Sequence, residues 1–229
     1  MKSNFSIFSR KFQNSQSFGE FQISEILANE FRQIEALIQI REMCNFRKPI
    51  PLSRKWAASP DFLLEICKVN FDFKPKLTLE LGSGLSTLVA SKTSAGKVIS
   101  LDESKEYSSV TKNELTRNEI YNAEVRWAPV RNEFDGGDWY QKSALLDIEN
   151  IDFLIVDGPS TINDPKIRLT AFEALISKLS KNCVILIDDG ARNAEKELAI
   201  KFGNALTNHN LVELDCEKGA FLIFPKSSQ

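Results

Sequence analysis

An apolar run that ends in a small-residue turn, LTLELGSGLST at residues 77–87, constrains this chain more than any other feature. A strand, a glycine turn and a helix start in this order build the ligand cleft of a doubly wound parallel sheet, at the carboxyl end of its first strand. Gly82 and Gly84 allow the backbone to approach a ligand closely, and the start of the next helix offers unpaired N–H groups. The pattern therefore predicts a nucleotide-sized binding site at this turn.

The spacing of the small residues bears on which cofactor the turn binds. In a dinucleotide fingerprint the third glycine would fall at position 87, where this chain has Thr87. In the adenosyl-binding variant of the motif the third small residue falls at position 86, which is Ser86. The chain fits the adenosyl variant slightly better, and the choice depends on the residues downstream.

Composition argues against several classes of protein. The chain has 229 residues, of which 42% are hydrophobic, enough for one core with an N-terminal appendage. Its 29 basic and 31 acidic residues leave a net charge of −2, and no long basic run suggests nucleic-acid binding. No apolar run approaches the length of a membrane-spanning helix, so no membrane partner is expected. The 4 cysteines lack the spacing of a zinc site or a disulfide framework, which favours a reduced, cytoplasmic protein.

Three segments are expected along the chain. Residues 1–22 are polar and predict a flexible tail or an arm on a partner subunit, although their bias is also found in organellar transit peptides. Residues 23–75 predict a helical extension or lid, since apolar residues recur at helical spacing from Ile23 to Asn45 and a short helix begins at Ser59 and Pro60. The long first helix would suit pairing with a second copy as a homodimer. Residues 76–229 hold the core domain.

The core domain alternates strands and helices in the order that a parallel sheet requires. After the first strand, further strands are expected at 97–102, 123–128, 151–157 and 183–188, with helices at 107–117, 167–179 and 194–206. The last two strands, at 211–214 and 220–224, follow each other without a helix and predict an antiparallel hairpin at one edge. The expected fold is therefore α/β, a doubly wound, mostly parallel seven-stranded sheet with an antiparallel C-terminal edge hairpin.

From about residue 56 to residue 224 the chain resembles a class I S-adenosylmethionine-dependent methyltransferase. More narrowly it is similar to small bacterial O-methyltransferase-like proteins with an LELGSGxST first motif. The segments that carry the resemblance are 79–87, 99–102, 128–130, 139–140, 156–159 and 187–192. Their joint order is typical of the superfamily and says much less about the methyl acceptor.

The resemblance implies cofactor contacts around the glycine turn. Glu80 would contact the methionine end of S-adenosyl-L-methionine, directly or through water, and an acid within an apolar strand is costly unless it is paired. The backbone of Gly82, Ser83 and Gly84, with Ser86, would line the cofactor, although the same residues would also make an ordinary tight turn.

Two further contacts with the cofactor are implied at the ends of the next two strands. Asp102 lies 20 residues after Gly82, where a carboxylate accepts both ribose hydroxyls, and its alternative role is to cap the next helix. Trp127 and Ala128 end the third strand, where the family places groups that flank the adenine. Trp127 suits a core position equally well.

Carboxylates also end the fourth and fifth strands. Asp157, Asp188 and Asp189 would repel one another unless a cation or a basic partner lies among them. Catechol-type O-methyltransferases bind a divalent ion, typically magnesium, at the corresponding positions, and such oxygen-rich sites suit a hard cation. Two departures weigh against this site: Ser160 stands where that family has a lysine, and Asp189 where it has an amide. The alternative is that Asp188 or Asp189 caps the following helix or pairs with Arg192.

The remaining polar residues near the strand ends have two interpretations each. Arg192 suits either an anionic acceptor or neutralisation of the aspartates, whereas for Arg168 the structural role is favoured. Trp139 and Tyr140 follow a glycine pair and predict a mobile lip that stacks on the acceptor or packs on the core. The lone histidine, His209, lies away from these strand ends, so acid–base work would fall to Asp157 or Asp189, or to a metal-bound oxygen.

Three functions are consistent with these residues. The favoured one is O-methylation of a small hydroxylated metabolite or sugar, with Asp157, Asp189 and Arg192 as the catalytic candidates. The second is a nicotinamide-dependent oxidoreductase, against which Thr87 and the edge hairpin argue. The third is a non-catalytic protein that keeps the fold for binding.

Overall fold

The computed structural model describes residues 5–46, 48–50 and 57–226, and side chains from residue 23 onward within these ranges. Its centre is a seven-stranded sheet with the strand order β3-β2-β1-β6-β7-β9-β8. The strands β3 to β7 in this order run parallel, whereas β9 is antiparallel to both β7 and β8. The predicted sheet with its antiparallel edge hairpin is therefore confirmed. The strands are β1 Leu77–Leu81, β2 Lys97–Asp102, β3 Ala123–Trp127, β6 Ile151–Val156, β7 Leu179–Ile187, β8 His209–Leu214 and β9 Ala220–Pro225.

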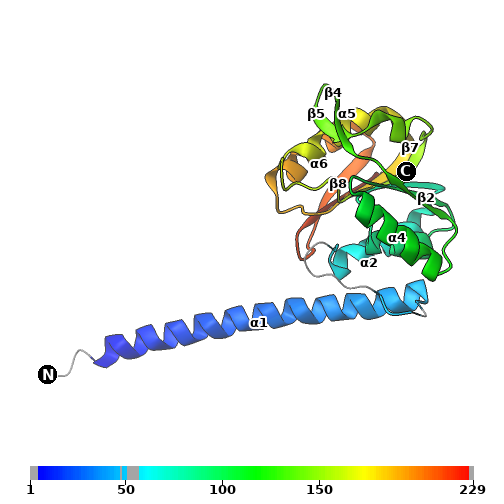
Figure 1. Cartoon of the computed structure of the whole chain (residues 1–229). Coiled ribbons are helices and arrows are strands. Elements are labelled where there is room, and N and C mark those ends of the chain that lie inside the picture. Colours follow the sequence, from blue (N-terminus) through cyan, green and yellow to red (C-terminus); the bar gives the residue numbers. More distant parts are fainter. Residues whose placement is uncertain (1–4, 47, 51–56, 227–229) are drawn as a thin grey trace.

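Helices cover both faces of the sheet (Figure 1). One apolar core lies between the sheet and the helices α1 to α4, and the other lies between the sheet and α5 and α6. Successive residues of β6 belong to opposite cores, Phe153 to the first and Leu154 to the second, as expected for a parallel strand that is buried on both faces. The helices are α2 Pro60–Phe73, α3 Leu85–Thr93, α4 Lys105–Arg117, α5 Thr170–Leu175 and α6 Asn193–Ala205.

The observed helices depart from the predicted ones at two places. The single helix expected at 167–179 is divided into the 3-10 turn η2 Ile167–Leu169, α5 and a second 3-10 turn, η3 Ile176–Lys178. Another 3-10 turn, η1 Lys142–Leu145, precedes β6. Of the predicted extension or lid, 23–75, residues 47 and 51–56 lie outside the described residues.

The first helix, α1 Phe5–Cys44, begins well before the start predicted at Ile23. Residues 5–22 are therefore helical, where we expected a flexible tail. Figure 1 shows α1 as one long rod whose later half runs along the domain while its earlier half extends beyond it. The later half is anchored by buried residues, among them Ile40 and Cys44, that join the core around α2. The division of the chain into tail, extension and core domain stays a prediction.

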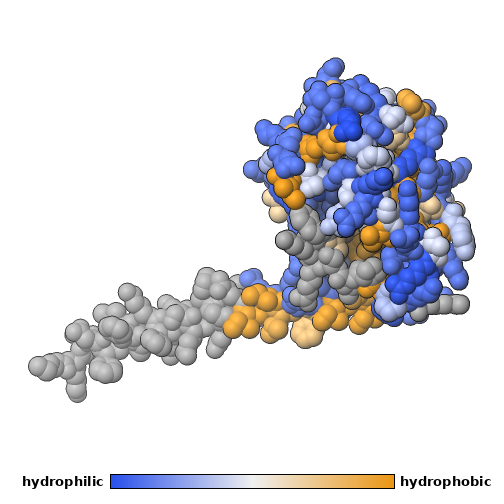
Figure 2. Space-filling view, in the orientation of Figure 1, coloured by the Kyte–Doolittle hydropathy of each residue, from blue (hydrophilic) through white to orange (hydrophobic). Residues whose placement is uncertain are grey.

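A stripe of apolar side chains on α1 is exposed. Leu27, Phe31, Ile34 and Ile38 are each more than half exposed, and their spacing of four, three and four residues places them on one helix face. Figure 2 shows this stripe along the part of α1 that passes beneath the domain. The homodimer expected from this helix stays a prediction.

A small hairpin precedes β6 that the sequence did not predict. Strands β4 Val130–Phe134 and β5 Gly137–Tyr140 pair antiparallel to each other, apart from the main sheet. Trp139 and Tyr140 are fully buried, and their rings meet edge to face with centroids 5.2 Å apart. Of the two alternatives for this pair, packing on the core is confirmed and the mobile lip is wrong, because both side chains belong to the core on the α5 and α6 side.

Among the helices that the structure describes, none combines the length and the apolar character needed to cross a bilayer.

Candidate functional site

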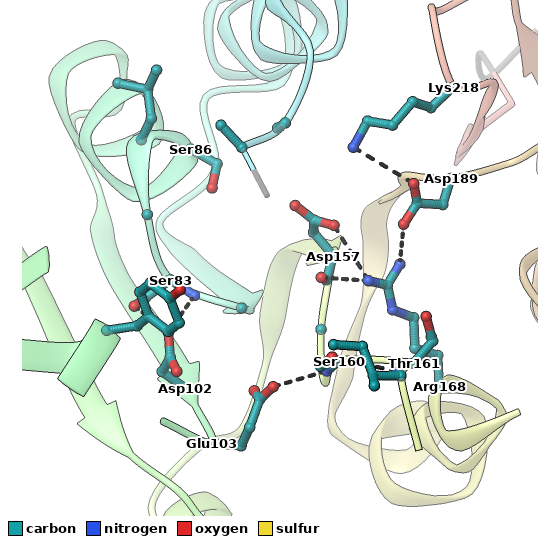
Figure 3. A pocket seen from close by; sticks show the side chains of 18 of the residues that line it. Ser83, Ser86, Asp102, Glu103, Asp157, Ser160, Thr161, Arg168, Asp189 and Lys218 are labelled. Carbon is teal, nitrogen blue, oxygen red and sulfur yellow. Dashed lines mark hydrogen bonds and ion pairs between the residues drawn. The ribbon is translucent and has the colours of Figure 1, made fainter. Parts of the chain in front are cut away.

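A cavity of about 470 Å³ opens at the carboxyl ends of β1, β2, β6 and β7 (Figure 3). This is where a doubly wound sheet is expected to bind its ligand. The predicted site residues that line the cavity are Gly82, Ser83, Gly84, Ser86, Asp102, Asp157, Asp189 and Arg192. Four others, Glu80, Trp127, Ala128 and Asp188, are not among its lining residues.

The glycine turn is shaped by backbone constraints. Gly82 has a φ of +90°, and a Cβ built there would lie 3.1 Å from the carbonyl oxygen of Asp157, so a side chain is excluded. At Gly84, by contrast, a Cβ would meet nothing within 4 Å. The turn is thus packed tightly against β6 at its first glycine and open toward the cavity at its second.

Thr87 stands where a dinucleotide motif has its third glycine, and its side chain has a structural role there. Its hydroxyl accepts a hydrogen bond from the backbone N–H of Gly84 at 3.0 Å and donates one to the carboxylate of Glu80. Glu80 is fully buried behind the turn, and burial raises the pKa of its carboxyl to about 7. Its Oε1 has no hydrogen-bond partner among the described residues. Glu80 therefore supports the turn from behind, and its predicted contact with a cofactor stays a prediction.

Asp102 ends β2 and faces the turn. Its Oδ2 accepts hydrogen bonds from the Ser83 backbone N–H, at 3.1 Å, and from the Ser83 hydroxyl, while Oδ1 accepts from the Ser104 N–H at 2.8 Å. Burial raises the pKa of its carboxyl. The cap of α4 is Ser104, whose hydroxyl accepts from the Tyr107 N–H at 3.2 Å. Asp102 thus holds the turn and lines the cavity, and the alternative role of helix cap falls to another residue.

The predicted site residues at the end of β3 are not among those that line the cavity. Trp127 is about half exposed, donates its indole N–H to the Glu103 carbonyl at 3.1 Å, and has the Lys105 ammonium 5.6 Å from its ring centroid. Ala128 is fully buried. Trp127 is therefore not a core residue, and the predicted adenine contacts of both residues stay predictions.

The three predicted strand-end carboxylates do come together. Oxygen atoms of Asp157, Asp188 and Asp189 lie within 4.8 Å of one another. Burial, followed by the negative charge of Asp188, raises the pKa of Asp157 to about 8. Burial also raises the pKa of Asp188, whose Oδ1 has no hydrogen-bond partner among the described residues.

Basic side chains already contact this cluster. The Arg168 guanidinium lies 3.0 Å from Asp189 Oδ2 and donates to the Asp157 carbonyl oxygen at 2.6 Å, and Arg192 lies 2.9 Å from the same Asp189 oxygen. Arg168 is 4% exposed, which agrees with the structural role favoured for it. Lys218 supplies a further cation, with Nζ 2.9 Å from Asp188 Oδ2.

The contacts bear on the predicted magnesium ion. Carboxylate oxygens suit a hard cation, but every carboxylate here is already paired with a side-chain cation, so the residues do not fit a site prepared for a divalent ion. In this cluster four carboxylates form ion pairs with three cations. The carboxylates are those of Asp157, Asp188, Asp189 and Glu195, and the cations are Arg168, Arg192 and Lys218.

A second cavity, of about 510 Å³, adjoins the first. It lies between α1, α2 and the turn that connects β8 to β9, and its apolar lining includes Leu37 and Leu63. The two cavities share Ala57, Ala58, Leu85 and Lys218. The two adjoining cavities therefore extend from the strand ends toward the N-terminal helices.

The sequence interpretation missed two charged residues of the site. Glu103 lines the cavity and accepts a hydrogen bond from the Ser160 N–H at 2.9 Å. Lys218 lies in the β8–β9 turn, and β9 pairs antiparallel with β7 so that Phe221 is opposite Ile187. The predicted edge hairpin already implied that its turn would lie at the carboxyl end of β7, which is the signal that could have identified Lys218. His209, at the opposite end of β8, lies away from the site as predicted.

Comparisons with known proteins found similar folds among solved structures. No family model matches the chain, and no sequence among curated proteins matches it. Solved structures do. Methyltransferase PaMTH1 from Podospora anserina, with bound SAH, has a TM-score of 0.58 at 17% identity over 84% of this chain and 88% of that chain. An O-methyltransferase from Bacillus cereus in complex with SAH has a TM-score of 0.56 at 16% identity over 85% and 91%. TomG, an O-methyltransferase from Streptomyces achromogenes in complex with SAM, has a TM-score of 0.53 at 12% identity over 85% and 89%.

This chain has the fold of those methyltransferases. The likeness extends over 84–85% of this chain and 88–91% of those chains.

Proposed function

We propose that this protein is an S-adenosylmethionine-dependent methyltransferase that methylates an oxygen of a small hydroxylated acceptor. The observation that carries the proposal is that Asp102 and the glycine turn, joined by hydrogen bonds to Ser83, together line the 470 Å³ cavity. Its volume is in the range of small-molecule sites. The fold shared with methyltransferases solved with SAH or SAM supports the choice of cofactor.

The chain offers a set of groups that suits this cofactor. Asp102 lines the cavity as a carboxylate at the end of β2, where ribose hydroxyls find an acceptor in nucleotide-binding sheets. The open space at Gly84 admits a ligand against the backbone, and α3 begins there; the first N–H groups of a helix have no partner within the helix and suit an anionic or polar ligand. The unpartnered Glu80 oxygen behind the turn would take a hydrogen bond through an intervening water.

The acceptor would lie beside Asp157. Bound S-adenosylmethionine would supply a methyl group on a sulfonium; its carbon–sulfur bond would break with the electron pair left on sulfur as the acceptor oxygen forms the new carbon–oxygen bond. Asp157 lines the cavity in the centre of Figure 3 and is placed to take the proton that the acceptor hydroxyl loses. Arg192, half exposed at the cavity wall, is placed to bind an anionic group of the acceptor. No step requires the predicted magnesium ion, and the carboxylates paired with Arg168, Arg192 and Lys218 do not suit one.

The test is ligand binding to the full chain. S-adenosylhomocysteine at a hundred times its dissociation constant adds roughly 2.7 kcal/mol to the free energy of unfolding, which raises the melting temperature by about 5–10 °C for a chain of this size. Reduced nicotinamide dinucleotide should give no shift. A shift with the dinucleotide alone would favour the oxidoreductase, and the absence of any shift with saturating S-adenosylhomocysteine would overturn the proposal.

A matched pair of variants locates the binding site. Asp102→Asn replaces a charged carboxylate, which accepts hydrogen bonds, by a neutral amide. This change should weaken S-adenosylhomocysteine binding roughly 10- to 100-fold. Asp72→Asn makes the same change at an exposed position of α2 and should leave the affinity unchanged. Incubation with methyl-labelled cofactor and a panel of phenols and sugars then separates an enzyme, which labels an oxygen, from a protein that only binds.

A further inference from the structure

Lys218 is held firmly at the carboxylate cluster. Its turn is joined to the loop after β7 by two backbone hydrogen bonds, from the Gly190 N–H to the Gly219 carbonyl at 2.8 Å and from the Ala191 N–H to the Lys218 carbonyl at 3.0 Å. The neighbouring Glu217 N–H donates to the Asp61 carboxylate on α2 at 2.8 Å. The backbone that carries the ammonium is thus fixed on both sides of the site.

The ammonium contacts two of the three clustered carboxylates. Lys218 Nζ lies 2.9 Å from Asp188 Oδ2 and 3.5 Å from Asp189 Oδ1. Figure 3 shows the Lys218 side chain beside Asp189, with a dashed line from its Nζ to that carboxylate, and Asp157 nearby at the centre of the view. Within the described part of the chain, Lys218 is the cation that contacts Asp188, since the guanidinium groups of Arg168 and Arg192 contact Asp157, Asp189 and Glu195 instead.

Lys218 also faces both cavities. Its side chain is 36% exposed and lines the cavity at the strand ends as well as the adjoining one. An ammonium has three N–H donors, and Asp188 and Asp189 use at most two of them. At least one donor therefore remains for an oxygen atom of a ligand.

We propose that the Lys218 ammonium is the built-in cation of this carboxylate cluster and takes the place of a divalent metal ion. The charge that a hard cation would bring to Asp157, Asp188 and Asp189 is supplied by the chain itself, and the remaining N–H faces the space for the acceptor oxygen. The ammonium keeps its protons and forms no covalent bond. The link to methyl transfer rests on the proposed function, whereas the place of the ammonium does not.

The test replaces the cation and measures metal binding without any turnover. Lys218→Met leaves the three clustered carboxylates without this partner, and the unpartnered Asp188 Oδ1 becomes available to a metal ion. Mg²⁺ should then raise the melting temperature of the variant by about 3–6 °C at ten times its dissociation constant. The wild-type protein should show no rise beyond that given by NaCl at equal ionic strength.

Two controls complete the experiment. Lys181→Met removes an exposed lysine of β7 and should behave as the wild type does. Titration of the wild-type protein with Mn²⁺, followed by the electron paramagnetic resonance signal of the free ion, needs no variant and remains decisive if Lys218→Met does not fold.

The outcomes separate this inference from the proposed function. Stoichiometric Mn²⁺ or Mg²⁺ binding to the wild type, or a folded Lys218→Met variant that gains no Mg²⁺ response, would overturn the role of Lys218. Failure of S-adenosylhomocysteine to bind would overturn the methyltransferase proposal and leave the metal titrations informative.

Discussion

Replacement of the buried Glu80 by glutamine should make the stability of this protein less sensitive to pH. Burial raises the pKa of the Glu80 carboxyl from 4.5 to about 7 in the folded chain. The folded state therefore holds a proton that the unfolded state releases between these two values. In this range the free energy of unfolding falls as the pH rises, and above pH 7 the full cost of an ionised, buried Glu80 is present.

The size of the effect follows from the two pKa values. The pKa is 4.5 in the unfolded chain and about 7 in the folded chain. This difference lowers the free energy of unfolding by roughly 0.8 kcal/mol at pH 5 and by roughly 3.3 kcal/mol at pH 8. Glutamine does not ionise, and its amide oxygen still accepts the Thr87 hydroxyl. The stability of Glu80→Gln relative to the wild type should therefore increase by about 2.5 kcal/mol between pH 5 and pH 8.

Urea denaturation of both proteins at several pH values measures this difference. The comparison between pH values cancels any constant effect of the amide group, such as a new unsatisfied N–H. Glu213→Gln, at an exposed position of β8, is the control for the loss of one carboxylate. A difference between wild type and Glu80→Gln that is equal at pH 5 and pH 8 would refute the reasoning.

Three further predictions concern the turn, the cluster and the first helix. Gly84→Ala places a methyl group in open space, so it should leave the melting temperature nearly unchanged and weaken S-adenosylhomocysteine binding by about tenfold in calorimetry. Arg168→Met leaves Asp157 and Asp189 without a buried guanidinium and should lower the free energy of unfolding by about 3–5 kcal/mol in urea. Phe31→Glu places a charge in the exposed apolar stripe of α1, and the mass in sedimentation should fall from twice 25.9 kDa to that of one chain.

Each of these predictions has a result that contradicts it. Unchanged S-adenosylhomocysteine affinity in Gly84→Ala would mean that no ligand lies against the turn. A loss below about 1 kcal/mol in Arg168→Met would mean that the cluster does not depend on this guanidinium. A wild-type protein that sediments as a single chain would remove the homodimer, and Glu35→Gln, at another exposed position of α1, serves as the control for Phe31→Glu.

The sequence alone determined the strands of the main sheet, their alternation with helices and the place of the site. Apolar strands that alternate with amphipathic helices form a parallel sheet, and all parallel strands end at the same edge. Asp102, Asp157 and Asp189 each follow a predicted strand, so their arrival at one cavity could be inferred from their positions along the chain.

Only the tertiary structure decided what surrounds these groups. Lys218 contacts Asp188 across 30 residues of sequence, and Glu103 contacts Ser160 across 57. Such pairs depend on how turns and loops pack, and no local periodicity encodes that packing. Trp139 and Tyr140 follow a glycine pair, which suggested a mobile surface segment. In the structure they belong to the β4–β5 hairpin, and both side chains are buried in the core. Local patterns thus specify which backbone elements form, whereas the partners of a buried charge depend on the packing of segments far apart in the chain.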